Sequence, residues 1–346
     1  MRDWIILLAL AGLAFFGFRY CACSGPPDEA GASESSDASE SEEGDVSLVR
    51  LESPTGEGQR PSPSPGGIKQ GLRDELTAIC RSMLADPSSV DLNRLQEIAR
   101  QADSGQAGGL AAAITAACGR NRIQAWKGLS RVHEAGLLHG EEREALLAEI
   151  ARQARLALRK PELSIGYRVV PGDSLARIRS RVREEHSLNV SPGMLRWVND
   201  LRGDTIYPDQ ELRIPKEPLE LWVSKELFLL RATVDGALIR EYPVGLGMED
   251  KTPTESFVLK APIKEAPWKD PLTGKLIYFG EPGYKIGTRW IGFEPKGPHG
   301  GLGIHGTDEP ESIGKAKSLG CIRMRNSDVE ELAELVSAGN TVRIVD

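Results

Sequence analysis

A stretch rich in Ser, Glu, Asp, Gly and Pro, from residue 24 to residue 67, restricts the fold more than any other feature. A composition this polar cannot bury enough apolar surface to offset the conformational entropy lost on folding. We therefore expect a disordered acidic linker here, and several domains along the 346 residues in place of one uniform globule. Such a linker would act as a tether for the later domains; an interaction tail with a basic partner is the alternative.

The negative charge of the chain is concentrated in this linker. The whole chain has a formal net charge of -7, but residues 24–45 carry eight acids and no base, so the remainder has a net charge of +1. Nucleic-acid binding usually needs a strongly basic surface. We therefore expect no nucleic-acid partner.

Residues 1–23 predict an export signal that also anchors the chain in a membrane. The fifteen residues 4–18 carry no charge and would span about 22 Å as a helix, somewhat less than a bilayer core. Phe18-Arg19-Tyr20 stands where a signal peptidase needs small residues, which favours an uncleaved anchor. Cleavage and lipidation at Cys23 remain the alternatives.

The middle of the chain, residues 68–162, repeats apolar residues at helical spacing and predicts a small helical segment. Cys80 and Cys118 lie on apolar helical faces, where either a disulfide or two buried thiols would fit. His133 and His139 have no partners at a spacing suited to a metal site. Since no chemistry is evident, we expect this segment to act as a spacer or a protein-interaction surface.

Residues 166–216 predict a compact strand-helix-helix-strand module. Its opening, centre and end are Tyr167-Arg168-Val169-Val170-Pro171-Gly172-Asp173-Ser174-Leu175, Asn199-Asp200-Leu201 and Pro208-Asp209-Gln210-Glu211-Leu212-Arg213-Ile214-Pro215. These phrases resemble a lysin-motif (LysM) domain, with Asp209 in place of the customary Gly. The resemblance implies a module that binds glycans containing N-acetylglucosamine, such as peptidoglycan strands.

A shallow groove beside the first strand-helix turn is the expected glycan site. We predict that Gly172, Asp173, Ser174 and Ile206 line it. The substitution at Asp209 leaves an alternative open, in which the module is a degenerate copy that serves only as a folding unit.

Beyond residue 218 the pattern changes to alternating strands, at 221–223, 227–234, 237–244, 256–259 and 341–345. Asp235-Gly236 between two of these runs predicts a tight hairpin. Ser327, followed three residues later by Glu330, predicts a capping box at the start of a helix that ends at Gly339. Residues 219–346 are therefore expected to form a mostly β domain.

Two phrases in this domain carry the chemistry, Gly303-Ile304-His305-Gly306-Thr307 and Ser318-Leu319-Gly320-Cys321-Ile322-Arg323-Met324. A thiol needs a base to become a nucleophile, and donors must hold the oxyanion that forms when it attacks a carbonyl. His305 is the candidate base for Cys321. The N–H groups of Gly320 and Cys321 could converge on an oxyanion, although a single Cys is as often a small buried apolar residue.

The spacing and the phrase Ser-x-Gly-Cys-Ile-Arg-Met resemble the catalytic domain of the YkuD-type L,D-transpeptidases. The resemblance implies Cys321 as nucleophile, His305 as base and Gly306 as the carbonyl that orients the imidazole. It also implies that Ser318, Gly320 and Arg323 shape the oxyanion and substrate surroundings; for Arg323 a structural ion pair is the alternative. Many relatives have His where this chain has Leu319. We expect no metal and no cofactor, and His299 is expected to be a loop residue.

Together these resemblances imply an enzyme of the bacterial cell envelope, on the periplasmic side and anchored in the inner membrane. Its partners would be the stem peptides and glycan strands of peptidoglycan. The implied reaction joins stem peptides through a Cys321 thioester with release of D-alanine, and carbapenems would acylate the same thiol. The alternatives are an L,D-carboxypeptidase that uses water as the acceptor, and an inert peptidoglycan-binding scaffold.

Overall fold

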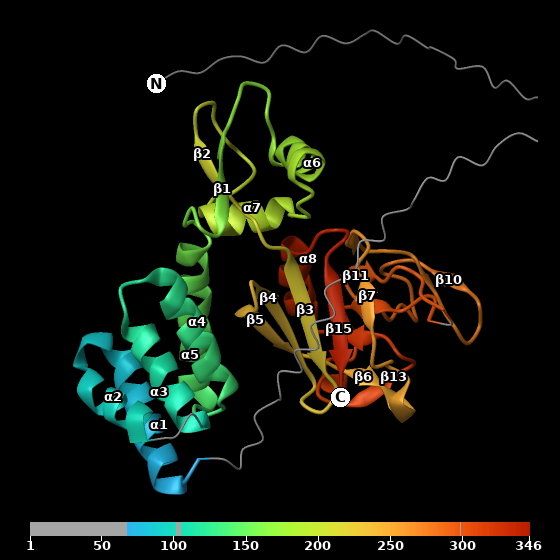
Figure 1. Cartoon of the computed structure of the whole chain (residues 1–346). Helices are drawn as coiled ribbons and strands as arrows, with labels where there is room; N and C mark the ends of the chain where they lie inside the picture. Colours follow the sequence, from blue (N-terminus) through green and yellow to red (C-terminus); the bar gives the residue numbers. More distant parts are fainter. Residues whose placement is uncertain (1–67, 102–104, 298) are drawn as a thin grey trace, which may run out of the picture. The chain divides into compact units, whose positions relative to one another are not determined.

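The computed structural model describes residues 68–101, 105–297 and 299–346 (Figure 1). The predicted anchor at 1–23 and the predicted linker at 24–67 lie outside the described residues. None of the helices in the described part is long and apolar enough to cross a membrane.

The middle of the chain is helical, as its apolar periodicity predicted. Its helices and one short 3-10 turn are α1 (Gln70–Ala85), η1 (Pro87–Ser89), α2 (Leu92–Gln101), α3 (Gln106–Cys118), α4 (Arg122–Glu134) and α5 (Gly140–Ala157). Leu76, Leu95, Ile114 and Ile150 are almost fully buried, because the apolar stripes of the helices face a common core. The Asn121 side chain caps α4 by accepting the N–H groups of Ile123 and Gln124. Cys80 and Cys118 are free thiols.

The next module has the order β1 (Ser164–Arg168), α6 (Leu175–His186), α7 (Pro192–Asn199) and β2 (Glu211–Pro215). The two strands pair antiparallel, with Ser164 opposite Pro215. Ser174 caps α6 through the Arg177 N–H. Asp209 takes a positive φ of 67°. Gly adopts that conformation without strain, whereas Asp, with its short polar side chain, tolerates it.

A five-stranded sheet forms one layer of the C-terminal domain, in the order β5-β4-β3-β15-β7. Its strands are β3 (Leu219–Ser224), β4 (Leu229–Val234), β5 (Ala237–Pro243), β7 (Ser256–Val258) and β15 (Thr341–Val345). The hairpin between β4 and β5 turns at Asp235-Gly236, where both residues have positive φ, as the sequence predicted. β15 pairs parallel with β3 and antiparallel with β7, so this strand lies in the interior of the sheet between them.

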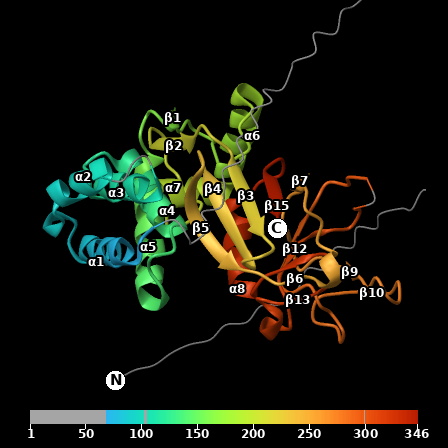
Figure 2. The same ribbon diagram turned by 60° about the horizontal axis from the view of Figure 1, so that its bottom comes forward.

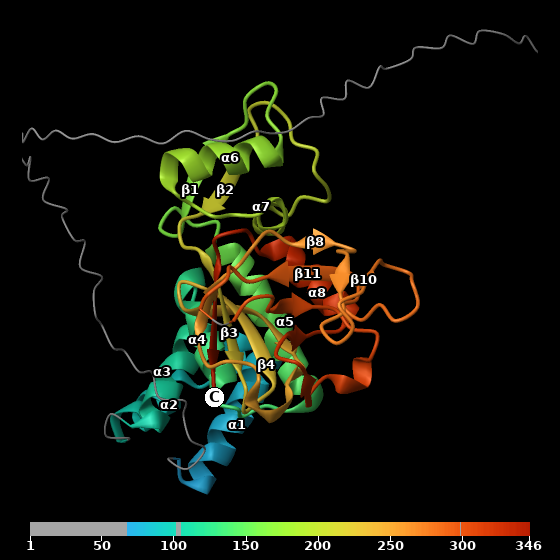
Figure 3. The same ribbon diagram turned by 90° about the vertical axis from the view of Figure 1, so that its right-hand side faces the viewer.

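A second, smaller sheet contains residues of the two phrases around His305 and Cys321. Its order is β14-β12-β11-β8, with β8 (Ile263–Lys264), β11 (Arg289–Gly292), β12 (Gly303–His305) and β14 (Ile322–Arg323). Two short pairs flank it, β6 (Leu246–Gly247) with β13 (Ala316–Ser318), and β9 (Trp268–Lys269) with β10 (Leu276–Ile277). The helix α8 (Asn326–Leu335) lies next to β11, as Figure 3 shows, and it also contacts β12. The remaining 3-10 turns are η2 (Met248–Asp250) and η3 (Pro310–Ser312).

The predicted bounds of the last helix are wrong. Helix α8 begins at Asn326 and ends at Leu335, before Gly339, and no side chain caps its first turn. The Ser327 hydroxyl bonds the Asp328 carboxylate instead of the helix backbone. The start is set by Asn326, whose amide accepts the Thr288 N–H and donates to the Thr307 carbonyl, and these are tertiary contacts that no local pattern contains.

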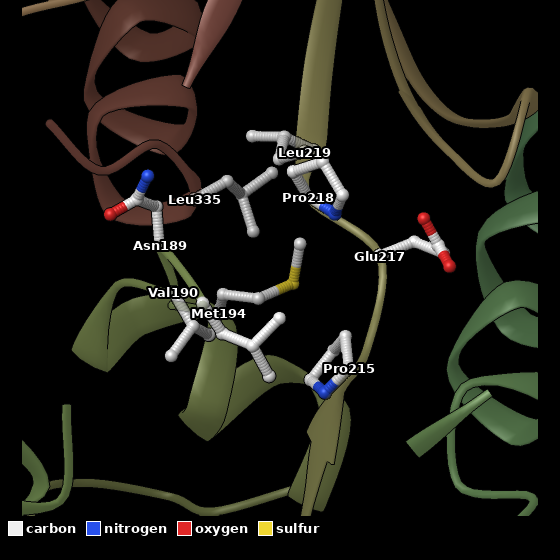
Figure 4. Close-up of a pocket in the computed structure, with 9 residues that line it drawn as sticks. Asn189, Val190, Met194, Pro215, Glu217, Pro218, Leu219 and Leu335 are labelled. Carbon is white, nitrogen blue, oxygen red and sulfur yellow. The ribbon is translucent and has the colours of Figure 1, made fainter. Parts of the chain in front are cut away.

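The three described modules contact one another directly. Helices α4 and α5 pack against the edge strand β5, and Figures 1 and 2 show them beside it. Helix α7 packs on α8, where the Ser191 hydroxyl donates to the Glu334 and Leu335 carbonyl oxygens. Figure 4 shows a small apolar pocket at this contact, into which Met194 and Leu335 point.

Candidate active site

The parallel pairing of β12 with β14 brings the two catalytic phrases together. Ile304 lies opposite Ile322 and His305 lies opposite Arg323, so Cys321 follows the strand direction back to a place beside Gly303. Side chains two residues apart on a strand point to the same face, so Cys321 and His305 share one face of neighbouring strands. The fold thereby brings the thiol and the imidazole, which are sixteen residues apart in the sequence, onto neighbouring strands.

His305 is held rigidly in a buried position. The residue is 5% exposed, and its ring stacks on the Trp290 ring with 5.7 Å between centroids. Its Nδ1 lies 2.5 Å from the Gly306 carbonyl oxygen, which can only accept, so Nδ1 carries the proton. The other ring nitrogen, Nε2, therefore keeps its lone pair and is free to accept a proton.

Burial sets the charge state of both groups. It lowers the pKa of His305 to about 4, although the hydrogen bond to the Gly306 carbonyl works in the opposite direction. Burial also raises the pKa of the Cys321 thiol, while the Gly303 N–H and the charge of Arg323 oppose that rise. At neutral pH the pair is therefore a thiol and a neutral imidazole, in place of a thiolate and an imidazolium.

The resting thiol is directed toward a backbone carbonyl. Its Sγ lies 3.9 Å from the Gly301 oxygen, and Cys321 remains partly exposed. Among the hydrogen bonds of the described residues, none joins this thiol to His305. Hydrogen bonds between a nucleophile and its base are commonly long in the free protein and tighten only in the substrate complex.

The turn that precedes the thiol is organised by Ser318 and Gly320. The Ser318 hydroxyl donates to the Cys321 carbonyl at 2.6 Å and accepts the Gly320 N–H at 3.1 Å. Gly320 has φ of 129°, a conformation that favours glycine. The Gly320 N–H is thus already engaged, so the Cys321 N–H is the remaining one of the two predicted oxyanion donors.

Asn326 supports the imidazole loop, and no sequence pattern indicated this role. Its bonds to Thr288 and Thr307 tie the loop after β12 to the start of α8. A side chain at position 306 would collide with the Asn326 amide oxygen, which explains a glycine there. A polar residue two positions after a motif is a common feature, so pattern alone could not have identified it.

Arg323, which lies opposite His305 in the β12–β14 pair, forms an ion pair with Glu309. Its Nη1 lies 3.0 Å from the Glu309 carboxylate, which also binds Lys285 at 3.1 Å. The Arg323 Nε is buried and has no hydrogen-bond partner in the described residues. The arrangement matches the ion pair considered from sequence, and it leaves the substrate role of Arg323 a prediction. Leu319 is 49% exposed.

The predicted glycan residues are partly committed to internal contacts. The Asp173 carboxylate is 2% exposed and accepts the Tyr167 hydroxyl and the Val170 N–H. Ser174 caps α6, and Ile206 packs against the core at the edge of the module. The Gly172 carbonyl accepts an Arg177 guanidinium N–H. A glycan here would meet mainly backbone groups and the outer side of Ile206.

His299 lies in a loop near Glu255, with 3.8 Å between its Nε2 and the carboxylate, and its ring edge meets Phe257. Over residues 68–101, 105–297 and 299–346, no group of three His, Cys, Asp or Glu side chains is placed to hold a metal ion.

Known proteins resemble this chain in two segments. Residues 219–344 match the family model of the L,D-transpeptidase catalytic domain (YkuD), and residues 167–215 match that of the LysM domain. The putative L,D-transpeptidase YqjB of Bacillus subtilis is 36% identical over 143 residues, which cover 41% of this chain and 78% of that protein. The putative L,D-transpeptidase YkuD of Bacillus licheniformis is 33% identical over 187 residues, 51% of this chain and 97% of that protein.

A solved structure of the L,D-transpeptidase LdtMt1 in complex with imipenem also resembles the chain. It is 17% identical, with a TM-score of 0.32, and the match covers 40% of this chain and 63% of that one. Because this TM-score is low, the classification depends on the sequence relatives.

Proposed function

This chain belongs to the L,D-transpeptidase family, with a LysM domain before the catalytic domain, and on that premise we propose that Cys321 forms a thioester with a peptidoglycan stem peptide. The acyl donor is a tetrapeptide stem that ends in D-alanine. The acceptor is an amine of a neighbouring stem. The product is a cross-link between the two stems.

In the first step the Cys321 sulfur bonds to the carbonyl carbon that precedes the terminal D-alanine, and His305 Nε2 takes the thiol proton. The carbon–nitrogen bond then breaks, and the imidazolium returns the proton to the departing amine. In the second step the acceptor amine attacks the thioester and gives its proton to Nε2. The carbon–sulfur bond breaks, and the thiol regains its proton.

One observation supports this proposal above the others. The Nδ1–H of His305 is fixed on the Gly306 carbonyl, so Nε2 is unprotonated on the same sheet face as Cys321. The low pKa of His305 keeps that nitrogen free at any pH above about 4. A neutral thiol beside a neutral base favours proton transfer at the moment of attack, without a preformed ion pair.

The test is the intact mass of the purified full-length protein after mixing with a disaccharide-tetrapeptide and no amine acceptor. We expect an adduct equal to the donor minus D-alanine, absent from Cys321→Ala and retained in the matched control Cys118→Ala. An adduct that persists in Cys321→Ala would contradict the assignment, as would folded protein with neither adduct nor product. Released tripeptide would instead identify water as the acceptor and an L,D-carboxypeptidase activity.

The remaining modules fit a cell-envelope enzyme. We propose that the LysM domain holds glycan strands near the catalytic domain, and that residues 1–67 tether both to the inner membrane on its periplasmic side. Fractionation of cells that produce the full chain tests the tether. Recovery of a shortened chain in the soluble periplasmic fraction would contradict an uncleaved anchor.

A further inference from the structure

The strand β5 lies at the edge of the five-stranded sheet, so its outer backbone groups need partners from outside that sheet. Two side chains of α4 supply them at Leu238. The Trp126 Nε1–H donates to the Leu238 carbonyl at 2.6 Å, and the Ser130 hydroxyl accepts the Leu238 N–H at 3.1 Å. Trp126 and Ser130 are one turn apart on the same helix face, and both are buried.

The same face of α4 continues along β5 to a buried carboxylate. The Glu241 side chain is 1% exposed, and His133 Nε2 lies 3.0 Å from one of its oxygens. Arg143 of α5 and Arg231 of β4 also bind this carboxylate. A buried charge is very costly without such partners. Two of the three partners, His133 and Arg143, belong to the helical segment. The buried charge of Glu241 on β5 is therefore compensated only when this segment packs against the strand.

The segment that follows β5 is hydrogen-bonded to the loop that contains Cys321. Gly245 exchanges two backbone hydrogen bonds with Arg323, both at 2.8 Å. Gly247 lies opposite Ser318, and its N–H donates to the Thr252 hydroxyl, which in turn donates to the Gly320 carbonyl. Only three residues lie between Glu241 and Gly245, and Gly245 pairs with Arg323 of the phrase that contains Cys321.

We propose that the helical segment is an intramolecular clamp: Trp126, Ser130, His133 and Arg143 hold the β5 edge, and through it position the segment 244–247, which includes β6 and supports the Cys321 loop. Sequence predicted a spacer or an interaction surface for this segment. The contacts assign it an internal partner, the catalytic domain of the same chain. These four are positioning residues, because none of them touches the thiol or the imidazole.

Two mild variants of the full-length protein test the clamp. Ser130→Ala removes the acceptor of the Leu238 N–H, and its matched control is Ser180→Ala, whose hydroxyl bonds only its own helix. Trp126→Phe removes the indole N–H, and its control is Trp222→Phe, which lies on β3 under Arg343. Each variant is followed by hydrogen exchange with mass spectrometry, by its melting temperature and by the rate of Cys321 acylation.

For Ser130→Ala and Trp126→Phe we expect amide exchange to accelerate about tenfold in 237–247 and also in 316–323, and to stay unchanged in 166–215. At saturating donor the acylation rate should fall severalfold, while the half-saturating donor concentration stays constant. Faster exchange confined to β5, with normal acylation, would overturn the proposal and leave only a stabilising contact. Unchanged exchange everywhere would also overturn it.

The kinetic part of this test rests on the proposed function, whereas the exchange part does not. If the wild-type protein forms no adduct but the exchange pattern is as expected, the clamp stands and the proposed reaction fails.

Discussion

The candidate site around His305 and the β5 edge each bury a titratable side chain, and the two surroundings have opposite effects on its charge. His305 meets a carbonyl and an aromatic ring, so burial lowers its pKa to about 4 and keeps it neutral. Burial alone would raise the pKa of Glu241, but His133 and Arg231 outweigh it and lower that pKa to about 2, which keeps the carboxylate charged. The neutral imidazole of His305 remains available for proton transfer, whereas the charged carboxylate of Glu241 is bound by His133, Arg143 and Arg231.

The largest expected effect breaks the catalytic side of this contrast. His305→Asn removes the base, so the acylation rate of Cys321 should fall by about 10² to 10⁴. Rapid-quench mixing with donor, followed by mass spectrometry of the protein, measures this rate. His299→Asn is the matched control, since the contacts of that side chain are with Glu255 and Phe257 and not with the thiol or the imidazole, and its rate should stay within about twofold of wild type. A His305→Asn rate equal to wild type would remove His305 from the mechanism.

Removing the charge of Glu241 should lower the free energy of unfolding more than it lowers the acylation rate of Cys321. Glu241→Gln leaves the surrounding cations without a counter-charge, and we expect the free energy of unfolding to fall by about 3 to 5 kcal/mol. Urea denaturation measures it. Glu220→Gln, an exposed glutamate on β3, should change it by less than about 0.5 kcal/mol. An equal decrease in the free energy of unfolding of the two variants would show that the buried charge cluster does not stabilise the fold.

Acid titration sharpens the contrast, because both groups have a folded-state pKa below the unfolded value. The unfolded chain then binds protons first, so both contributions are complete at high pH and are lost as pH falls. For His305 the window runs from pH 6.5 down to about 4, and for Glu241 from 4.5 down to about 2. Each step is worth about 3 kcal/mol.

Unfolding measured at a series of pH values separates the two windows. His305→Asn should weaken the pH dependence in the upper window and leave the lower one intact. Glu241→Gln should leave the upper window intact and weaken the lower one without abolishing it, because carboxyl groups such as those of Glu75, Asp173 and Glu309 also have lowered pKa values. A single variant that flattens both windows would show that the two regions are not independent.

The smallest expected effect concerns Asn326, an uncharged residue whose hydrogen bonds support the loop after His305. Asn326→Ala removes two hydrogen bonds, to Thr288 and Thr307, and should lower the free energy of unfolding by about 1 to 3 kcal/mol. The acylation rate should fall severalfold as well, because the His305 loop loses its brace. Ser327→Ala, on the next residue of α8, is the control and should change neither quantity. Retention of wild-type acylation in Asn326→Ala would assign the residue a purely structural role.

Much of the local structure follows from short sequence patterns. Helical periodicity located the middle segment, alternation located β3, β4, β5 and β15, and Asp235-Gly236 located a hairpin that the structure contains. The capping box failed at Ser327 because Asn326, one residue earlier, is held by two loops that are distant in the chain. Local propensity is overridden where tertiary hydrogen bonds outweigh it.

The candidate site divides in the same way. The sequence determined the residue types of the thiol, the base and the tight turn, and through them the family. Only the tertiary structure decided that β12 and β14 pair in parallel, that Asn326 braces the imidazole loop, and that His133 meets Glu241 across 108 positions of sequence. Turns and periodicity depend on a few neighbouring residues, whereas register and buried charge pairing depend on how whole elements pack.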